Sequence, residues 1–123
     1  MNIRSEALNW LQQKGVSRTG CQVLTSKRYL PGESWTKEKA WWVWVPLSAI
    51  RAGKTILIVC QAERQSSNFR LLEVPAEFFK KHLAGFAERD DKLNLFLSAE
   101  PGREFREERG SGKLSLALFE RVV

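Results

Sequence analysis

The chain has 123 residues, of which 43% are hydrophobic and 28% charged, and its formal net charge is +6. This length suits one packed core and is too short for two, so we expect a single globular domain over residues 1–123. The composition excludes a collagen-like or disordered chain, and no apolar stretch approaches the roughly 20 residues that a membrane-spanning helix needs.

The first half of the chain predicts a helix followed by strands. Apolar residues recur at helical spacing over residues 3–14, between an N-cap residue, Asn2, and Gly15, which suits the helix end. Residues 21–29 alternate loosely between apolar and polar, which predicts a half-exposed or edge strand. The segments 40–45 and 54–62 carry bulky residues on both faces, so we expect two central strands that are covered on each side.

The second half predicts a shorter strand over residues 69–74 and a helix near residues 76–88 that begins just after Pro75. Two further strands are expected over residues 93–98 and 114–122. Few helices and many short strands predict an α+β fold with one mixed β-sheet of about five or six strands, an N-terminal helix and this second helix. The tryptophan-rich strand is expected near the middle of the sheet.

Charge and tryptophan are both concentrated in the first half of the chain. Residues 1–62 hold nine Lys or Arg against three Glu, a net charge of +6, whereas residues 63–123 hold eleven of each sign, a net charge of zero. All five tryptophans also lie before residue 45. Nucleic-acid surfaces combine such groups, because cations neutralise phosphates and rings stack on unpaired bases. A solubilising charge without a specific partner is the alternative interpretation.

The segment 27–39 is the strongest candidate site in the sequence. It carries four cations and two aromatic residues just before the tryptophan-rich strand. Arg109 is a further candidate because it stands next to glycine, where an arginine can approach a phosphate, with Arg103 and Arg106 nearby as helpers. The alternatives are a solvated loop whose tryptophan packs on the core and a plain hairpin after position 109. The predicted nucleic-acid-binding residues are Lys27, Arg28, Tyr29, Trp35, Lys37, Lys39 and Arg109.

The residue types that most catalytic and metal sites require are scarce. The chain has one histidine, His82, on the apolar side of a predicted helix, and two cysteines, Cys21 and Cys60. This set lacks the spacing of a zinc site and leaves a nucleophilic triad without partners, so we expect no metal, no cofactor and no catalytic residue. No apolar signal core follows the start of the chain, and we therefore expect a cytoplasmic protein with both thiols reduced.

A strand motif with Gln22 and Leu24 is followed by a turn and two apolar strands. Over about residues 20–75 this arrangement resembles degenerate PD-(D/E)xK nuclease-like domains, in which Gln22 would match the family's acidic residue or glutamine. Leu24 stands where the family has its catalytic lysine, and no aspartate precedes Asp90. Glu6 on the first predicted helix matches the helix carboxylate of some members. The resemblance implies a nuclease-derived binding domain and places magnesium-dependent cleavage in doubt.

Three functional hypotheses are consistent with these features. The leading one is a non-catalytic nucleic-acid-binding domain that uses the basic, aromatic first half. The second is a divergent metal-dependent nuclease that uses some of Glu6, Glu33 and Glu38. The third is a protein-interaction or oligomerisation module whose exposed tryptophans pack on a partner or on a second copy of the chain. No membrane partner is expected.

Overall fold

A computed structural model describes residues 2–33 and 37–123. The helices are α1 (Ile3–Gln13), α2 (Leu47–Arg51) and α3 (Ala76–Lys81), and 3-10 turns η1 and η2 lie at Leu83–Gly85 and Ala117–Phe119. The strands are β1 (Cys21–Ser26), β2 (Ala40–Pro46), β3 (Thr55–Gln61), β4 (Phe69–Val74), β5 (Ala87–Arg89), β6 (Lys92–Ser98) and β7 (Glu120–Arg121). The α+β class that the sequence predicts is confirmed.

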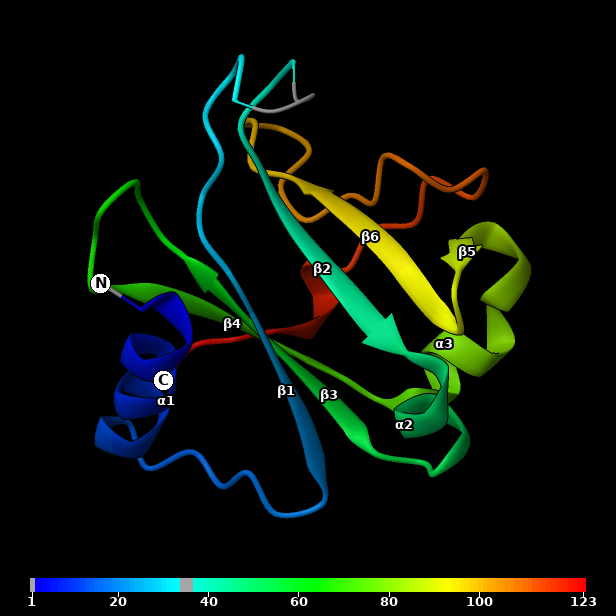
Figure 1. The fold of residues 1–123 in the computed structure, drawn as a ribbon, viewed down its shortest axis with the longest axis horizontal. Coiled ribbons are helices and arrows are strands. Elements are labelled where there is room, and N and C mark those ends of the chain that lie inside the picture. Colours follow the sequence, from blue (N-terminus) through cyan, green and yellow to red (C-terminus); the bar gives the residue numbers. More distant parts are fainter. Residues whose placement is uncertain (1, 34–36) are drawn as a thin grey trace.

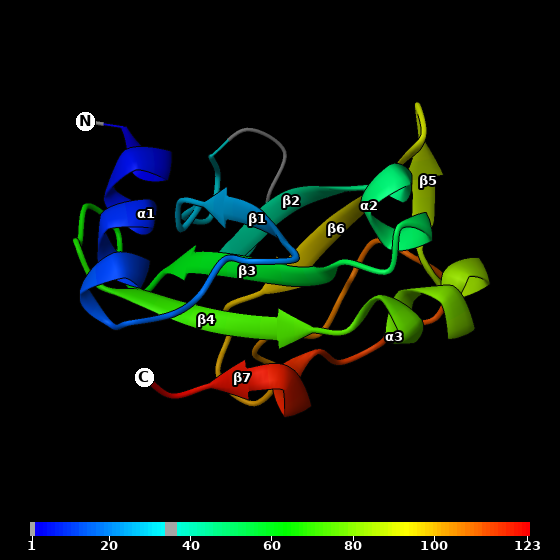
Figure 2. The same cartoon turned by 90° about the horizontal axis from the view of Figure 1, so that it is seen from below.

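The strands divide between two sheets. Sheet A has the order β1-β3-β4-β7, in which β1 is parallel to β3 and the other pairs are antiparallel (Figure 2). Sheet B is antiparallel and has the order β2-β6-β5. Sheet A lies between α1 on one side and sheet B on the other (Figure 1). The sequence predicts one sheet instead of two, because periodicity identifies strands without showing how they pair.

Alternate side chains of β3 contribute to the two halves of the hydrophobic core. Leu57 and Val59 pack towards α1, whereas Ile56 and Ile58 pack towards sheet B, and all four are fully buried. Successive side chains of a strand point to opposite faces, so β3 is covered by a different layer on each side. This confirms β3 as a central strand. The prediction of a half-exposed or edge strand over residues 21–29 is confirmed for Cys21–Ser26, because β1 ends sheet A.

The two faces of the tryptophan-rich strand β2 are buried to different degrees, whereas the sequence predicts a strand buried on both sides. Trp41, Val43 and Val45 are buried between the sheets, whereas Trp42 and Trp44 are half-buried on the outer face of sheet B. β2 also stands at the end of sheet B, not in the middle of a larger sheet. Composition does not distinguish a strand buried on both faces from one with a half-buried face, since large aromatic side chains occur both in cores and on partly exposed faces.

Two elements in the second half also differ from the prediction. The helix expected near 76–88 ends at Lys81, and only the turn η1 continues it. The segment 114–122 is mostly irregular and contributes only the two residues of β7 to a sheet. Leu116 is fully buried, and its amide donates to the Phe105 carbonyl at 2.9 Å. This segment therefore fills the core where the sequence pattern predicts a strand.

A buried carboxylate holds the segment that follows β6. The Glu107 side chain is fully buried, and its Oε2 accepts hydrogen bonds from the amides of Phe96 and Arg109, both at 2.9 Å. Its Oε1 accepts from the Gly110 amide at 2.5 Å. A Cβ at Gly110 would lie 2.1 Å from the Gly85 carbonyl oxygen. Only glycine allows this backbone approach, which brings the chain close enough to surround the carboxylate.

Glu107→Ala is expected to lower the free energy of unfolding by about 3–5 kcal/mol, because three amides lose their acceptor. Glu107→Gln keeps one carbonyl oxygen and is expected to lose less. Urea unfolding followed by far-UV circular dichroism measures both variants. A loss below about 0.5 kcal/mol for Glu107→Ala, which is ordinary for a surface substitution, would show that these contacts do not hold the segment.

Candidate nucleic-acid interface

Three aromatic side chains form a row on the outer face of sheet B. Trp42 and Trp44 are two residues apart on β2 and point to the same face, with ring centroids 5.7 Å apart. Tyr29 extends the row, because its backbone pairs with that of Ala40 and its ring centroid lies 6.4 Å from that of Trp42. All three side chains are half-buried. Tyr29, Trp42 and Trp44 are named the aromatic strip.

Cations border the Trp44 end of the aromatic strip. Arg89 and Lys92 flank the two-residue turn between β5 and β6, in which Asp90 and Asp91 have φ values of 53° and 61°. Left-handed backbone at both central positions is typical of the type I′ hairpin turn. Trp44, Arg89, Asp90 and Lys92 together line a pocket of about 160 Å³. An indole face and two cations therefore meet in one hollow of the surface.

Lys27 borders the Tyr29 end of the strip. Its Nζ lies 4.9 Å from the Tyr29 ring centroid, within cation–π range. Glu33 is close by, with Oε2 at 3.8 Å from Lys27 Nζ and Oε1 at 2.5 Å from an Arg64 guanidinium nitrogen. Hydrogen bonds from the Leu30 amide and from Arg64 lower the pKa of the Glu33 carboxyl. This end of the strip therefore carries two cations with one carboxylate between them.

A further ion pair lies beside β6. The Glu108 amide donates to the Phe96 carbonyl at 2.8 Å, so the segment around Glu107 runs alongside this strand. Glu107 points inward, and alternation turns Arg106 and Glu108 to the outer face, where they form an ion pair. Their hydrogen bond raises the pKa of Arg106 and lowers that of Glu108. The outer face of sheet B is thus flanked by charges on this side as well.

The structure places Lys27 beside Tyr29 and directs the Arg28 side chain elsewhere. The Arg28 guanidinium carbon lies 5.6 Å from the Trp41 ring centroid, and the guanidinium donates to the Ala62 carbonyl. Trp41 is fully buried between the two sheets. Arg28 is therefore engaged by the interior of the fold, while its two sequence neighbours belong to the surface.

The remaining predicted residues lie around the edges of this face or beyond it. Lys37 is exposed, and Lys39 is half-buried with its amide donating to Glu100 Oε2 at 2.8 Å. Arg109 is exposed directly after the segment that runs beside β6. Trp35 lies outside the described residues. Among the predicted residues that the structure describes, Tyr29 belongs to the aromatic strip and Lys27 contacts its ring.

The sequence alone does not single out Trp42, Trp44, Arg89 and Lys92 as members of this surface. The two tryptophans alternate with buried residues of the same strand. Because every one of these side chains is large and apolar, the sequence does not show which face of the strand is buried. The two cations belong to the electrically neutral second half of the chain. The pair of aspartates between Arg89 and Lys92 is typical of a short hairpin turn, and it is the sequence feature that could have placed the two cations side by side. Only strand pairing brings that turn beside Trp44.

Two of the three carboxylates of the nuclease hypothesis form ion pairs with different arginines, and the third lies on another element. Glu33 is paired with Arg64, and Glu38 forms an ion pair with Arg103. Glu6 lies on α1, which packs against sheet A on the side away from sheet B. Among the residues that the structure describes, no three His, Cys, Asp or Glu side chains group closely enough to hold a metal ion.

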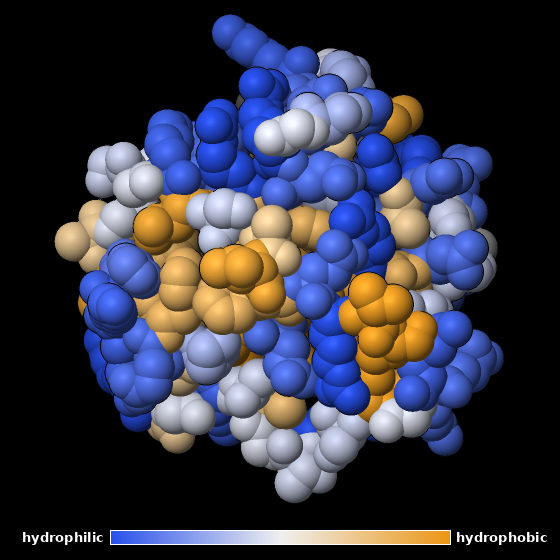
Figure 3. All heavy atoms as spheres, turned by 180° about the vertical axis from the view of Figure 1, so that it is seen from behind, coloured by the Kyte–Doolittle hydropathy of each residue, from blue (hydrophilic) through white to orange (hydrophobic). Residues whose placement is uncertain are grey.

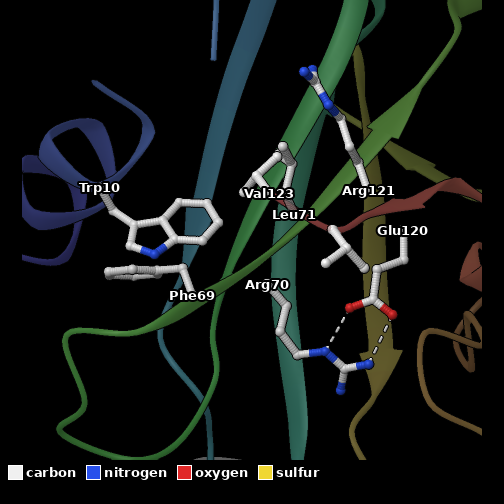
Figure 4. Close-up of a pocket in the computed structure, with 8 residues that line it drawn as sticks. Trp10, Phe69, Arg70, Leu71, Glu120, Arg121 and Val123 are labelled. Atoms are coloured by element: carbon white, nitrogen blue, oxygen red, sulfur yellow. Dashed lines mark hydrogen bonds and ion pairs between the residues drawn. The ribbon is translucent and has the colours of Figure 1, made fainter. Parts of the chain in front are cut away.

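A different face of the molecule carries separate apolar areas among hydrophilic residues (Figure 3). The C-terminal segment exposes Leu118 and Val122, each to 93%. A pocket of about 170 Å³ adjoins β7, and in it Arg70 donates to the two carboxylate oxygens of Glu120 at 2.8 and 2.9 Å (Figure 4). Those hydrogen bonds raise the pKa of Arg70. The Arg70 guanidinium in this pocket is therefore paired within the protein.

Comparison of the chain with models of known protein families, with curated proteins and with solved structures finds no match. In the described part of the chain, no helix has the length and apolar character to cross a membrane. The function proposed below is therefore based on the outer face of sheet B.

Trp44→Ala is expected to lower the free energy of unfolding by about 1 kcal/mol, because this side chain is half-buried on the surface. Trp41→Ala is expected to lower it by about 3–5 kcal/mol, because Trp41 is fully buried and its loss leaves a cavity. Urea unfolding measures both. Equal losses would contradict the placement of the two side chains on opposite faces of β2.

Proposed function

We propose that this protein is a non-catalytic nucleic-acid-binding domain that uses the outer face of sheet B. One observation carries the proposal: the aromatic strip has cations at both ends, Lys27 beside Tyr29 and Arg89 with Lys92 beside Trp44. A nucleic-acid strand offers bases and phosphates along its length. Cations neutralise the phosphates and release counterions, and aromatic faces stack on the bases.

Unpaired bases are the form of nucleic acid that the strip suits best. Bases inside a duplex stack on one another and present only their edges in the grooves. An unstacked base instead offers its whole face to the exposed part of an aromatic side chain on a sheet surface. Each stacked base contributes about 1–3 kcal/mol to binding, and every base has such a face. Single strands are therefore expected to bind more tightly than duplexes of the same length.

Carboxylates reduce the positive charge of this face without cancelling its affinity for phosphate. Glu33, Asp90 and Glu108 each form an ion pair with a cation of the face. Exposed ion pairs contribute about 0–1 kcal/mol, so a phosphate group competes with them at low cost. The net charge of +6 favours the approach of a polyanion to the molecule as a whole.

Two variants separate the ionic from the stacking contribution. Arg89→Gln/Lys92→Gln is expected to reduce the slope of log K against log salt by about 1.4, since each phosphate contact on a single strand contributes about 0.7. Trp44→Ala is expected to weaken binding about 5- to 150-fold, which corresponds to one stacked base. Fluorescence anisotropy with a labelled single strand, in the presence of a chelator, measures both effects.

The matched control is Lys14→Gln/Arg18→Gln, which removes two exposed cations at the end of α1 and in the loop after it. This control changes the net charge equally and is expected to leave the salt slope nearly unchanged. The proposal is overturned if neither single strands nor duplexes bind the wild-type protein at low salt, where phosphate contacts are strongest.

The same samples discriminate the other two hypotheses. Incubation with Mg²⁺ or Mn²⁺ in place of the chelator would reveal a nuclease through shortened oligonucleotides. Light scattering that reports a salt-insensitive dimer, together with a change in tryptophan fluorescence on association, would indicate an oligomerisation module. Either result in the absence of stable nucleic-acid binding would replace the proposal.

A further inference from the structure

Three donors from two parts of the chain converge on the Glu33 carboxylate. The Leu30 amide donates to Oε1 at 2.6 Å, and an Arg64 guanidinium nitrogen donates to the same oxygen at 2.5 Å. Lys27 Nζ lies 3.8 Å from Oε2. Arg64 is positioned by a second hydrogen bond, to the Arg28 carbonyl at 3.4 Å. Lys27, the Leu30 amide and Arg64 are named the oxyanion cradle.

The oxyanion cradle is open to solvent and adjoins a pocket. Lys27, Arg64, Gln61, Gln65 and Ile3 line this pocket, which has a volume of about 140 Å³. The side chains of Lys27 and Arg64 keep 41% and 35% of their surface exposed. A small tetrahedral anion therefore has access to both cations and room beside them.

We propose that the oxyanion cradle is a binding site for a phosphate-type anion, and that the Glu33 carboxylate occupies it as an internal competitor. Guanidinium, ammonium and backbone amide groups are the donors that proteins use for phosphate as well as for carboxylate. Exposed ion pairs of this kind contribute little to stability. An incoming anion that displaces the Glu33 carboxylate takes its place on these donors.

The position of the cradle connects it to a nucleic-acid strand. Lys27 belongs to the cradle and also lies over the Tyr29 ring, so the cradle borders the aromatic strip. A base that stacks on Tyr29 brings its own phosphate towards Lys27. Recognition of a nucleic-acid phosphate at the cradle rests on the proposed function, whereas binding of a free phosphate does not. The two sources are separated by experiment.

The first experiment uses a free anion. Glu33→Gln removes the competing charge and keeps the size of the side chain. Pyrophosphate titrated into this variant is expected to shift the NMR signals of the Leu30 amide and the Arg64 guanidinium, with an affinity about two- to five-fold above that of the wild-type protein. Lys27→Gln added to Glu33→Gln is expected to remove the gain, because the cradle then has one cation fewer.

The matched control is Glu73→Gln. Glu73 lies on β4 and pairs with Arg121 at 2.9 Å, so the variant loses one negative charge and one exposed ion pair outside the cradle. It is expected to bind pyrophosphate as the wild-type protein does. An equal gain in Glu33→Gln and Glu73→Gln would overturn the inference, because net charge alone would then explain it.

The second experiment uses a single-stranded oligonucleotide. Glu33→Gln is expected to bind it about two- to five-fold more tightly at low salt, with a salt slope steeper by up to about 0.7, since no carboxylate has to be displaced. If pyrophosphate binds as expected and no oligonucleotide binds, the cradle stands and the proposed function fails. If oligonucleotides bind wild-type protein and Glu33→Gln equally, and pyrophosphate shifts neither NMR signal, the proposed function stands and the cradle is overturned.

Discussion

A continuous set of ring and guanidinium contacts between the two sheets decides which face of β2 meets solvent. The Arg28 guanidinium carbon lies 5.6 Å from the Trp41 ring centroid, and the Trp41 and Phe105 rings stack 4.9 Å apart with 14° between their planes. The Arg70 guanidinium carbon lies 4.5 Å from the Phe105 centroid. The Trp41 indole also donates to the Gln61 carbonyl at 2.8 Å. With Trp41 fixed inward, its neighbours on β2 turn outward and create the aromatic strip.

Both ends of this set are held by oxygen acceptors, which gives two arginines a structural role. Arg70 pairs with Glu120 and Glu104, and Arg28 donates to the Ala62 carbonyl. Cation–π contacts are strongest when the groups are shielded from water, as they are near the buried Trp41. The positive charge of a segment therefore does not measure the positive charge of a surface, since part of it stabilises the packing of the sheets.

The sequence is sufficient for elements whose signal is local. β3 is identified by its long apolar run, β4 by a shorter strand pattern that ends at Pro75, and α1 by apolar spacing bounded by Asn2 and Gly15. Features that depend on how strands pair and sheets pack cannot be predicted from local sequence patterns. Trp41 and Trp42 are chemically identical neighbours, and only the packing of sheet B on sheet A makes one a core residue and the other a surface residue. The same holds for Arg89 and Lys92, which reach the candidate interface only because β5 pairs with β6.

The ion pairs of the outer face have a consequence for what stays bound there. Lys27, Arg89 and Arg106 already have anionic neighbours, so a ligand that offers only negative charge has to displace such a neighbour from each cation it binds. A ligand that also lays flat rings against the indoles gains something that no carboxylate of the protein supplies. The flat rings of a ligand therefore decide how long it stays bound to this surface more than its charge density does. Polyanions without such rings are expected to dissociate sooner.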